Sequence, residues 1–243
     1  VYRRMGAGGL GIYPSWAVPD EAVGREEEYL RAQWEKNWVP FRDADFSLVG
    51  YVKIDPGFHA PRIKREVARR RAAGLFVYPD QLFTELGDAV EALAKVTKER
   101  VRTWVICEEI DAWVSNPSAP AGSGTCELAR HILMTRIAYQ RLKKVDPGFF
   151  VPGLAVCMDY ASNPPYRLVR SLARELRDSV DGIGVHPYCG NHQVGVGAPT
   201  GPEAGGLRDV LLRTRQLQKE WGKSGTLLIP EKGLSVPYHA PLD

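Results

Sequence analysis

The sequence contains no apolar segment long enough to cross a membrane as a helix. A membrane-spanning helix needs about 20 consecutive apolar residues, and the apolar runs of this 243-residue chain are much shorter. The first residues also lack the charged-then-apolar pattern of a secretory signal. Since Val1 is not an initiator methionine, we expect a processed or trimmed chain. No transmembrane segment is predicted.

Cysteine is scarce, and nothing in its spacing indicates a metal site. None of the four cysteines belongs to a C-x-x-C pair, and no histidine–cysteine cluster has the spacing of a zinc site. Four of the five histidines are scattered and are predicted to be structural or solvent-facing, namely His59, His131, His192 and His239. We therefore expect no metal and no cofactor.

Charge of one sign is not in excess over the whole chain. The 32 basic residues are balanced by 29 acidic ones, which leaves a formal net charge of +3. This balance gives no reason to expect a nucleic-acid or acidic-membrane partner. The densest basic run, residues 64–71, is interpreted as the solvated face of a helix.

Short runs rich in Val, Ile, Leu and Phe alternate along the chain with longer amphipathic segments. This alternation is typical of βα units with parallel strands. Strands are predicted near residues 7–12, 46–54, 74–78, 102–107, 150–157, 182–186 and 226–230. Helices are predicted near residues 20–36, 61–72, 82–98, 125–144, 165–178 and 205–221. The apolar residues of the fourth of these helices recur at a helical period: Leu128, Ile132, Leu133, Ile137 and Leu142.

Seven strands with six intervening helices predict the α/β class and a TIM (β/α)8 barrel whose eighth βα unit is absent from this chain. Residues 1–243 are expected to form a single barrel domain, incomplete at its C-terminus. In such barrels the catalytic groups follow the C-terminal ends of the strands.

Two of the predicted strands run directly into glutamates. The segment TWVICEEID places Glu108 and Glu109 after the predicted fourth strand, and LLIPEKGLS places Glu231 after the seventh. A separation of 122 residues between Glu109 and Glu231 leaves room for three βα units. Both glutamates are therefore expected at the active-site face of the barrel.

These segments resemble clan A glycoside hydrolases. TWVICEEID is similar to the clan's Asn-Glu-Pro motif, LLIPEKGLS to its Thr-Glu-aromatic-Gly motif, and residues 181–188 (DGIGVHPY) to its sixth-strand segment. The resemblance extends over roughly residues 74–235 and is nearest to β-xylosidase or xylanase-like members, such as family thirty-nine. It implies a retaining hydrolase that cleaves O-glycosidic bonds of an oligosaccharide or glycoside substrate.

The resemblance also implies a role for each matching residue. Glu109 would be the general acid/base and Glu231 the nucleophile that forms a covalent glycosyl-enzyme, because glycoside hydrolysis uses two carboxyl groups. Tyr188 would donate a hydrogen bond to the nucleophile, with His186 lining the same floor. Trp113 is the candidate platform for a sugar ring, whereas Trp104 is predicted to lie in the core.

The chain departs from the clan's motifs at four positions. Glu108 stands where the clan has Asn, and Ile110, Pro230 and Lys232 replace Pro, Thr and an aromatic residue. A second carboxylate beside Glu109 would change its pKa, so Glu108 is a candidate substrate contact or the mark of an altered site. The alternative is a catalytically inactive carbohydrate-binding barrel. A metal-dependent barrel hydrolase would need His and Asp ligands at several strand ends, and the sequence has no such cluster.

Overall fold

The computed structural model describes residues 9–12, 18–38, 47–53, 59–106, 123–157, 175–186 and 207–223. Its strands are β1 (Gly9–Ile12), β2 (Ser47–Tyr51), β3 (Val101–Val105), β4 (Pro152–Cys157) and β5 (Gly182–His186). Its α-helices are α1 (Glu26–Trp38), α2 (Pro61–Ala72), α3 (Asp80–Thr97), α5 (Ser123–Val145) and α7 (Leu207–Glu220). Two short 3-10 helices are η2 (Asp20–Ala22) and η5 (Arg177–Ser179).

The described strands are parallel and follow one another in chain order. β1, β2 and β3 form one sheet, and β4 and β5 form another. A parallel bridge joins Thr103 to Phe150, and the amide of Trp104 donates to the carbonyl of Phe150 at 2.9 Å, so the second sheet continues from the first. The predicted α/β class with parallel strands is thereby confirmed, although the described strands do not close into a barrel.

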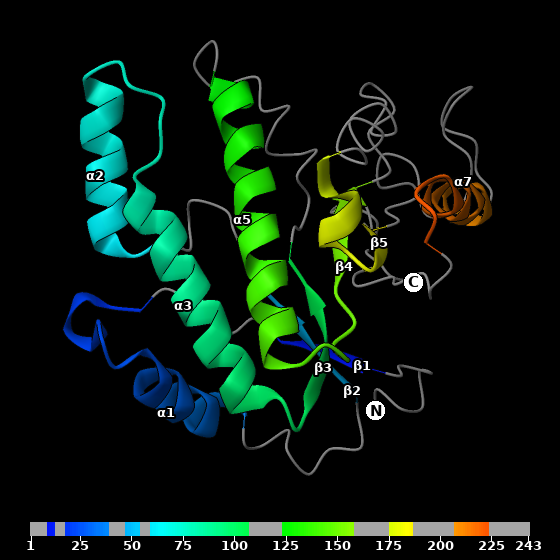
Figure 1. Cartoon of the computed structure of the whole chain (residues 1–243), viewed down its shortest axis with the longest axis horizontal. Coiled ribbons are helices and arrows are strands. Elements are labelled where there is room, and N and C mark those ends of the chain that lie inside the picture. Colours follow the sequence, from blue (N-terminus) through cyan, green and yellow to red (C-terminus); the bar gives the residue numbers. More distant parts are fainter. Residues whose placement is uncertain are drawn as a thin grey trace, which may run out of the picture.

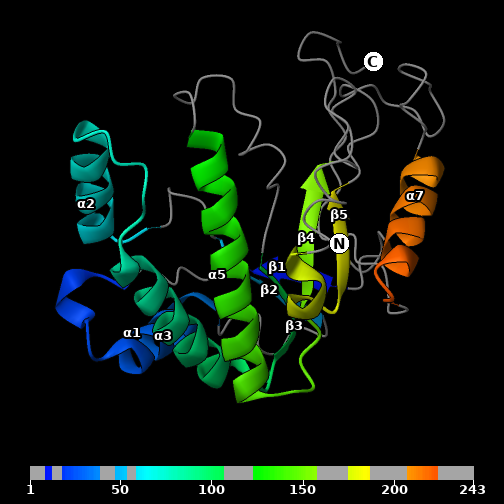
Figure 2. The same cartoon turned by 45° about the horizontal axis from the view of Figure 1, so that its top comes forward.

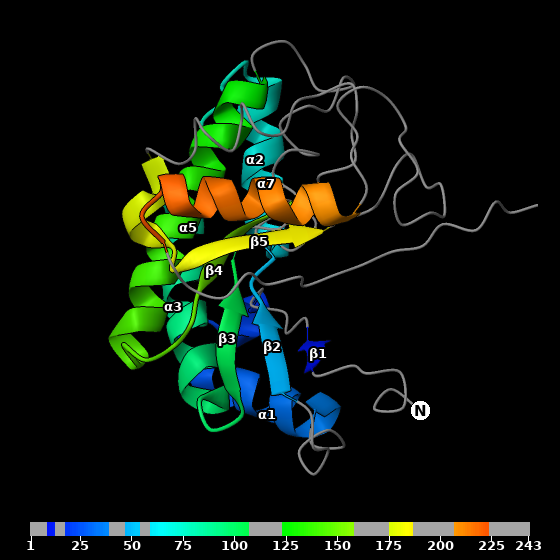
Figure 3. The same ribbon diagram turned by 90° about the vertical axis from the view of Figure 1, so that its right-hand side faces the viewer.

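The helices cover one face of the first sheet. α3 and α5 pack against each other beside β2 and β3, with α1 beneath α3 (Figures 1 and 2). β2 and β3 point the same way, and α7 lies alongside β5 (Figure 3). Parallel strands require such crossover helices, because the chain must return to the edge where one strand began before the next strand can begin.

The core between α3 and the sheet follows from the helical period. Leu82, Leu86, Val90 and Leu93 are buried along one face of α3, spaced at three and four residues as an inward-facing stripe demands. On the sheet side, Trp104 is fully buried, which confirms its prediction as a core residue. Its ring takes the space beside Gly50, where a Cβ atom would lie 2.5 Å from the ring carbons.

The strand predicted at 74–78 is wrong. Gly74 adopts a positive φ of 74° and its amide donates to the carbonyl of Arg71, while Leu75 donates to Arg70, both at 2.9 Å. This is a glycine-based helix end, and it commits the following residues to a connection between α2 and α3. β2 pairs directly with β3 instead. A five-residue apolar run alone could not distinguish the two outcomes.

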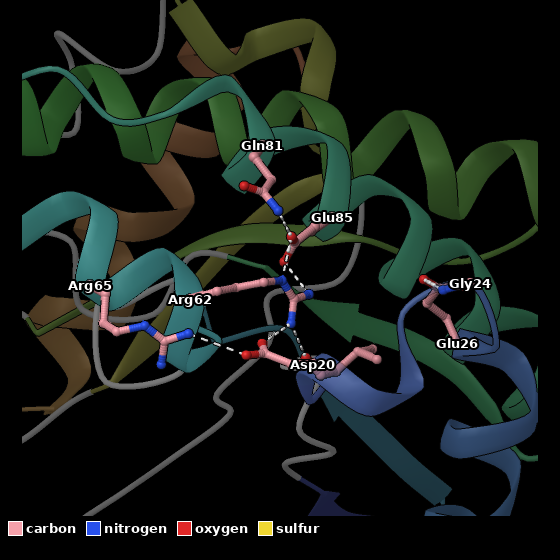
Figure 4. A network of polar contacts seen from close by, with 8 residues as sticks. Asp20, Gly24, Glu26, Arg62, Arg65, Gln81 and Glu85 are labelled. Atoms are coloured by element: carbon pink, nitrogen blue, oxygen red, sulfur yellow. Dashed lines mark hydrogen bonds and ion pairs between the residues drawn. The ribbon is translucent and has the colours of Figure 1, made fainter.

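Arg62 holds the base of α2 against two other segments (Figure 4). Its guanidinium donates to both carboxylate oxygens of Glu85 on α3, at 2.7 and 2.6 Å. It also donates to Asp20 at 2.7 Å and to the carbonyl of Val18 at 3.0 Å. The Arg62 hydrogen bond lowers the pKa of Asp20. Two-pronged arginine–carboxylate pairs fix orientation as well as distance, so this clamp sets how α2 leaves the body of the protein.

Candidate active site

The residues predicted to carry the chemistry follow strands whose ends the structure defines. β3 ends at Val105, and Val105 and Ile106 are both buried. Glu108, Glu109 and Trp113 come next in the chain but lie outside the described residues, as do Tyr188 and Glu231. The pairing of Glu109 with Glu231 therefore stays a prediction.

His186 is the one predicted site residue whose backbone is described. It is the last residue of β5 and is paired with Cys157, the last residue of β4. On the other sheet Val105 of β3 is paired with Tyr51 of β2. Within each of these two pairs, the C-terminal ends of the strands are thus level and define one edge of the sheet. This is the edge where α/β barrel enzymes carry their catalytic groups.

Asp181, the first residue of the DGIGVHPY segment, lies at the opposite edge. It accepts hydrogen bonds from the Tyr139 hydroxyl at 3.0 Å and the Val151 amide at 2.8 Å, and forms an ion pair with Lys143 at 2.7 Å. Burial, followed by the charge of Asp181, raises the pKa of Tyr139 to about 12. Asp181 therefore ties α5 to the starts of β4 and β5, and its role is structural.

A buried polar cluster that the sequence did not predict joins α5 to the residues just before α2 and α3. It combines His59, which follows β2, with Tyr78 and with Arg130 and His131 of α5. The Arg130 side chain is 2% exposed, and its guanidinium lies 2.9 Å from His131 Nε2 and 3.4 Å from His59 Nε2. Because arginine can only donate, both ring nitrogens accept. Arg130 also lies 5.0 Å from the centre of the Tyr78 ring, within the range of a cation–π contact.

Arg130 carries the fixed positive charge of this cluster. Burial, followed by the charge of Arg130, lowers the pKa of His131 well below its usual value. A neutral His131 is required for its ring nitrogen to accept from Arg130. His59 and His131 are buried, which confirms the structural alternative predicted for them.

The buried face of α5 differs from the one marked by its apolar residues. Leu133 is exposed, and Leu128, Ile132 and Ile137 are half-buried, whereas Arg130, His131, Met134, Thr135, Ala138 and Leu142 are buried. Polar side chains can occupy such a face when each finds a partner, as Thr135 does by donating to the His131 carbonyl at 2.7 Å. The only trace of this face in the sequence is the spacing of four residues between His131 and Thr135 and between Met134 and Ala138.

Among the described residues, no group of three or more His, Cys, Asp or Glu side chains is placed to hold a metal ion. In the same part of the chain, no helix is long and apolar enough to cross a membrane. Neither finding bears on the segments that contain the predicted glutamates.

No protein-family model matches the chain, and neither does any curated protein. Its structure, however, is similar to solved glycoside hydrolases. The β-glycosidase of Thermosphaera aggregans is 14% identical with a TM-score of 0.62, covering 96% of this chain and 67% of its own. A β-glucosidase of Thermotoga maritima gives a TM-score of 0.62 at 10% identity, covering 96% and 64%. A GH10 endoxylanase from a sugarcane soil metagenome gives 0.54 at 12%, covering 94% and 67%.

The chain therefore has the fold of glycoside hydrolases, proteins of the TIM-barrel class. Among the first matches it spans about half to two thirds of the other chain, for example 56% of the Pyrococcus furiosus β-glucosidase. At identities of 10–14%, the likeness establishes the fold and not the catalytic residues.

Proposed function

We propose that this protein is a retaining glycoside hydrolase, with Glu109 as general acid/base and Glu231 as nucleophile. The observation that carries the proposal is the course of β3, a parallel strand whose last residues are buried and which is followed in the sequence by Glu108 and Glu109. The fold similarity to β-glycosidases and a xylanase supports it. The residues of the motifs favour a β-xylosidase or xylanase-like member of the clan. Residues 1–243 would form one barrel domain, incomplete at its C-terminus.

β3 would correspond to the clan's fourth strand because of the motif that follows it, and not because of its position in the order of strands. With the segment 74–78 removed from the strands, β3 is third along the described part of the chain. In the sequence, Glu108 and Glu109 nevertheless follow the end of β3 after only Ile106 and Cys107. The predicted seventh strand, 226–230, lies outside the described residues, so Glu231 rests on the resemblance.

The chemistry assigns distinct protonation states to the two carboxyl groups. Retaining enzymes place them about 5–5.5 Å apart, so that one attacks the anomeric carbon while the other protonates the leaving oxygen. Two carboxylates so close push their pKa values apart. Tyr188 would donate to the nucleophile, and His186, Trp113 and Glu108 would contact the substrate.

The test is turnover of a panel of aryl β-glycosides (xyloside, glucoside, galactoside and arabinoside) by the unaltered chain and by three variants. Glu231→Ala is expected to abolish turnover, and added azide should restore it as a glycosyl azide, since a small anion can occupy the space of the lost carboxylate. Glu109→Ala should lower turnover about 10²–10⁴-fold for a substrate with a poor leaving group. The loss should be much smaller for a nitrophenyl glycoside, whose leaving group needs no proton.

Glu99→Ala is the matched control, because Glu99 is an exposed residue between α3 and β3. It should retain full activity. Equal loss in all three variants would indicate general destabilisation and would count against the assignment. Glycan binding without turnover by the unaltered chain would establish the inactive carbohydrate-binding barrel, the alternative that the Glu108 departure favours.

A further inference from the structure

Positive charge is concentrated in one element of this nearly balanced chain. The segment 61–77, here called the basic hairpin, consists of α2 and the residues that turn back from it. It carries six basic side chains and one acidic side chain, a formal charge of +5, whereas the whole chain carries +3. The remaining residues therefore carry −2.

The end of the basic hairpin is apolar and exposed. Leu75, Phe76 and Val77 are 55%, 37% and 67% exposed, three of the six large hydrophobic residues that are exposed in the described part of the chain. Two arginines lie beside them: Arg70 reaches the carbonyl of Val77 at 3.5 Å, and Arg71 donates to the hydroxyl of Tyr78 at 3.0 Å. An apolar tip bordered by basic groups is the composition of an interaction surface.

The basic hairpin is fixed at its base and projects from the body. The Arg62 clamp and the buried side chain of Ile63 hold the start of α2, and the buried residues Tyr78 and Pro79 hold the return to α3. Between these anchors α2 stands at the outer side of the molecule, away from all described strands (Figures 1 and 2). The side chains of Leu75 and Val77 are therefore accessible.

We propose that the basic hairpin docks the protein on the surface of an anionic phospholipid bilayer. The partner must supply negative charge at its surface and an apolar layer just beneath it. A bilayer interface has both within a few ångströms. Nucleic acid and acidic polysaccharides have the charge but no layer to accept Leu75 and Val77. A protein groove would need to be concave around a tip of three consecutive residues, whereas lipid adapts to its shape.

This attachment is peripheral, and it does not depend on the proposed hydrolase activity. Electrostatic attraction contributes about a factor of five per basic residue near an anionic surface, and the apolar tip adds insertion to it. The whole-chain balance gave no reason to expect an acidic membrane, because it averages the basic hairpin with an acidic remainder.

The first measurement is sedimentation of the 243-residue chain with vesicles of phosphatidylcholine alone and of phosphatidylcholine mixed with phosphatidylserine. Binding is expected to the mixed vesicles only, and to weaken with added salt. Arg65→Gln with Arg69→Gln should weaken it about tenfold or more. The matched control is Arg215→Gln with Lys219→Gln, which removes the same charge from the exposed face of α7 and should leave binding unchanged.

The second measurement tests insertion. Leu75→Ser with Val77→Ser should weaken binding about tenfold or more, whereas Leu212→Ser, at an exposed leucine of α7, should not. No binding of the unaltered chain to mixed vesicles would overturn the proposal, as would equal losses in the hairpin variants and their controls. Weaker vesicle binding of the charge variant but not of the tip variant would show that only charge attracts the protein and that nothing inserts into the bilayer. This result would also overturn the proposal. Binding to soluble poly-glutamate but not to vesicles would assign the surface to an acidic protein instead.

Discussion

Arg62 and Arg130 each join three segments of the chain, and their described partners differ in kind. Arg62 is 16% exposed on its side chain and is neutralised by Glu85 and Asp20. Arg130 is almost fully buried, and the described groups around it are two imidazoles, an aromatic ring and the sulfur of Met134. Among the described contacts, Arg62 thus pairs with carboxylates near water, and Arg130 contacts imidazole nitrogens, a ring face and a sulfur atom in the interior.

The comparison shows how the described partners of a guanidinium differ between a site near the surface and one in the interior. Carboxylate partners remain strong near the surface because the guanidinium fork matches two oxygens at once. In the interior, a cation must have polar groups around it to offset its lost hydration. His131 can accept from Arg130 only while neutral, so the buried cluster is sensitive to pH in a range where the clamp is not.

The largest effect is expected from Arg130→Ala. Removing a buried guanidinium leaves a cavity and two imidazole nitrogens without their donor. The free energy of unfolding should fall by about 3–5 kcal/mol. Urea unfolding followed by circular dichroism measures this, with Arg130→Met as the control that retains most of the packing volume. A loss below about 1 kcal/mol for the alanine variant would show that the cluster contributes little.

The second prediction concerns acid. The folded-state pKa of His131 lies below its unfolded value near 6.5, so its contribution to stability is present above pH 6.5 and is lost as the pH falls below it. The slope should be about 1.4 kcal/mol per pH unit for each proton taken up only on unfolding. Unfolding free energies between pH 7 and pH 5 measure it. His131→Gln, which keeps an acceptor for Arg130 but does not titrate, should flatten the curve, and an unchanged slope would contradict the prediction.

Arg62→Ala should have a smaller effect, about 1–2 kcal/mol, because its hydrogen bonds lie partly in water. Arg62→Lys should recover part of this loss by keeping the charge without the fork. Because the pKa of Asp20 is lowered in the folded state, the clamp's contribution to the free energy of unfolding is lost only as the pH falls below about 4. The contribution of His131 is lost at higher pH. If Arg62→Ala changed the slope of the unfolding free energy against pH above pH 5, the two arginines would not differ in pH dependence as predicted.

The smallest expected effect is that of salt. Ion pairs near the surface are screened, with a Debye length of about 10 Å at 0.1 M and 3 Å at 1 M. The difference in stability between the unaltered chain and Arg62→Ala should shrink by a few tenths of a kcal/mol over this range. The corresponding difference for Arg130→Ala should stay constant. Equal salt dependence of the two differences would show that Arg130 is less shielded from solvent than its burial indicates.

Much of the fold was predictable because its signals are local. The helix predicted at 61–72 is α2 at the same bounds, and α3 and α5 fall within two residues of their predicted ranges. The parallel order of the strands follows from alternation with helices. The site was predictable only as a list of residues: β3 leads toward Glu109 as predicted, but the meeting of Glu109 and Glu231 depends on segments outside the described residues.

The sequence by itself determined the helices, the parallel strands and the strand end that leads into Glu108 and Glu109, because side-chain period and helix-end chemistry act over a few residues. Only the tertiary structure decided that 74–78 is a connection between α2 and α3, since β2 pairs directly with β3. It alone also brought His59 beside Arg130, 71 residues away. A hydrogen bond between such distant residues has no local signature, because the chain's path through the whole fold sets their separation.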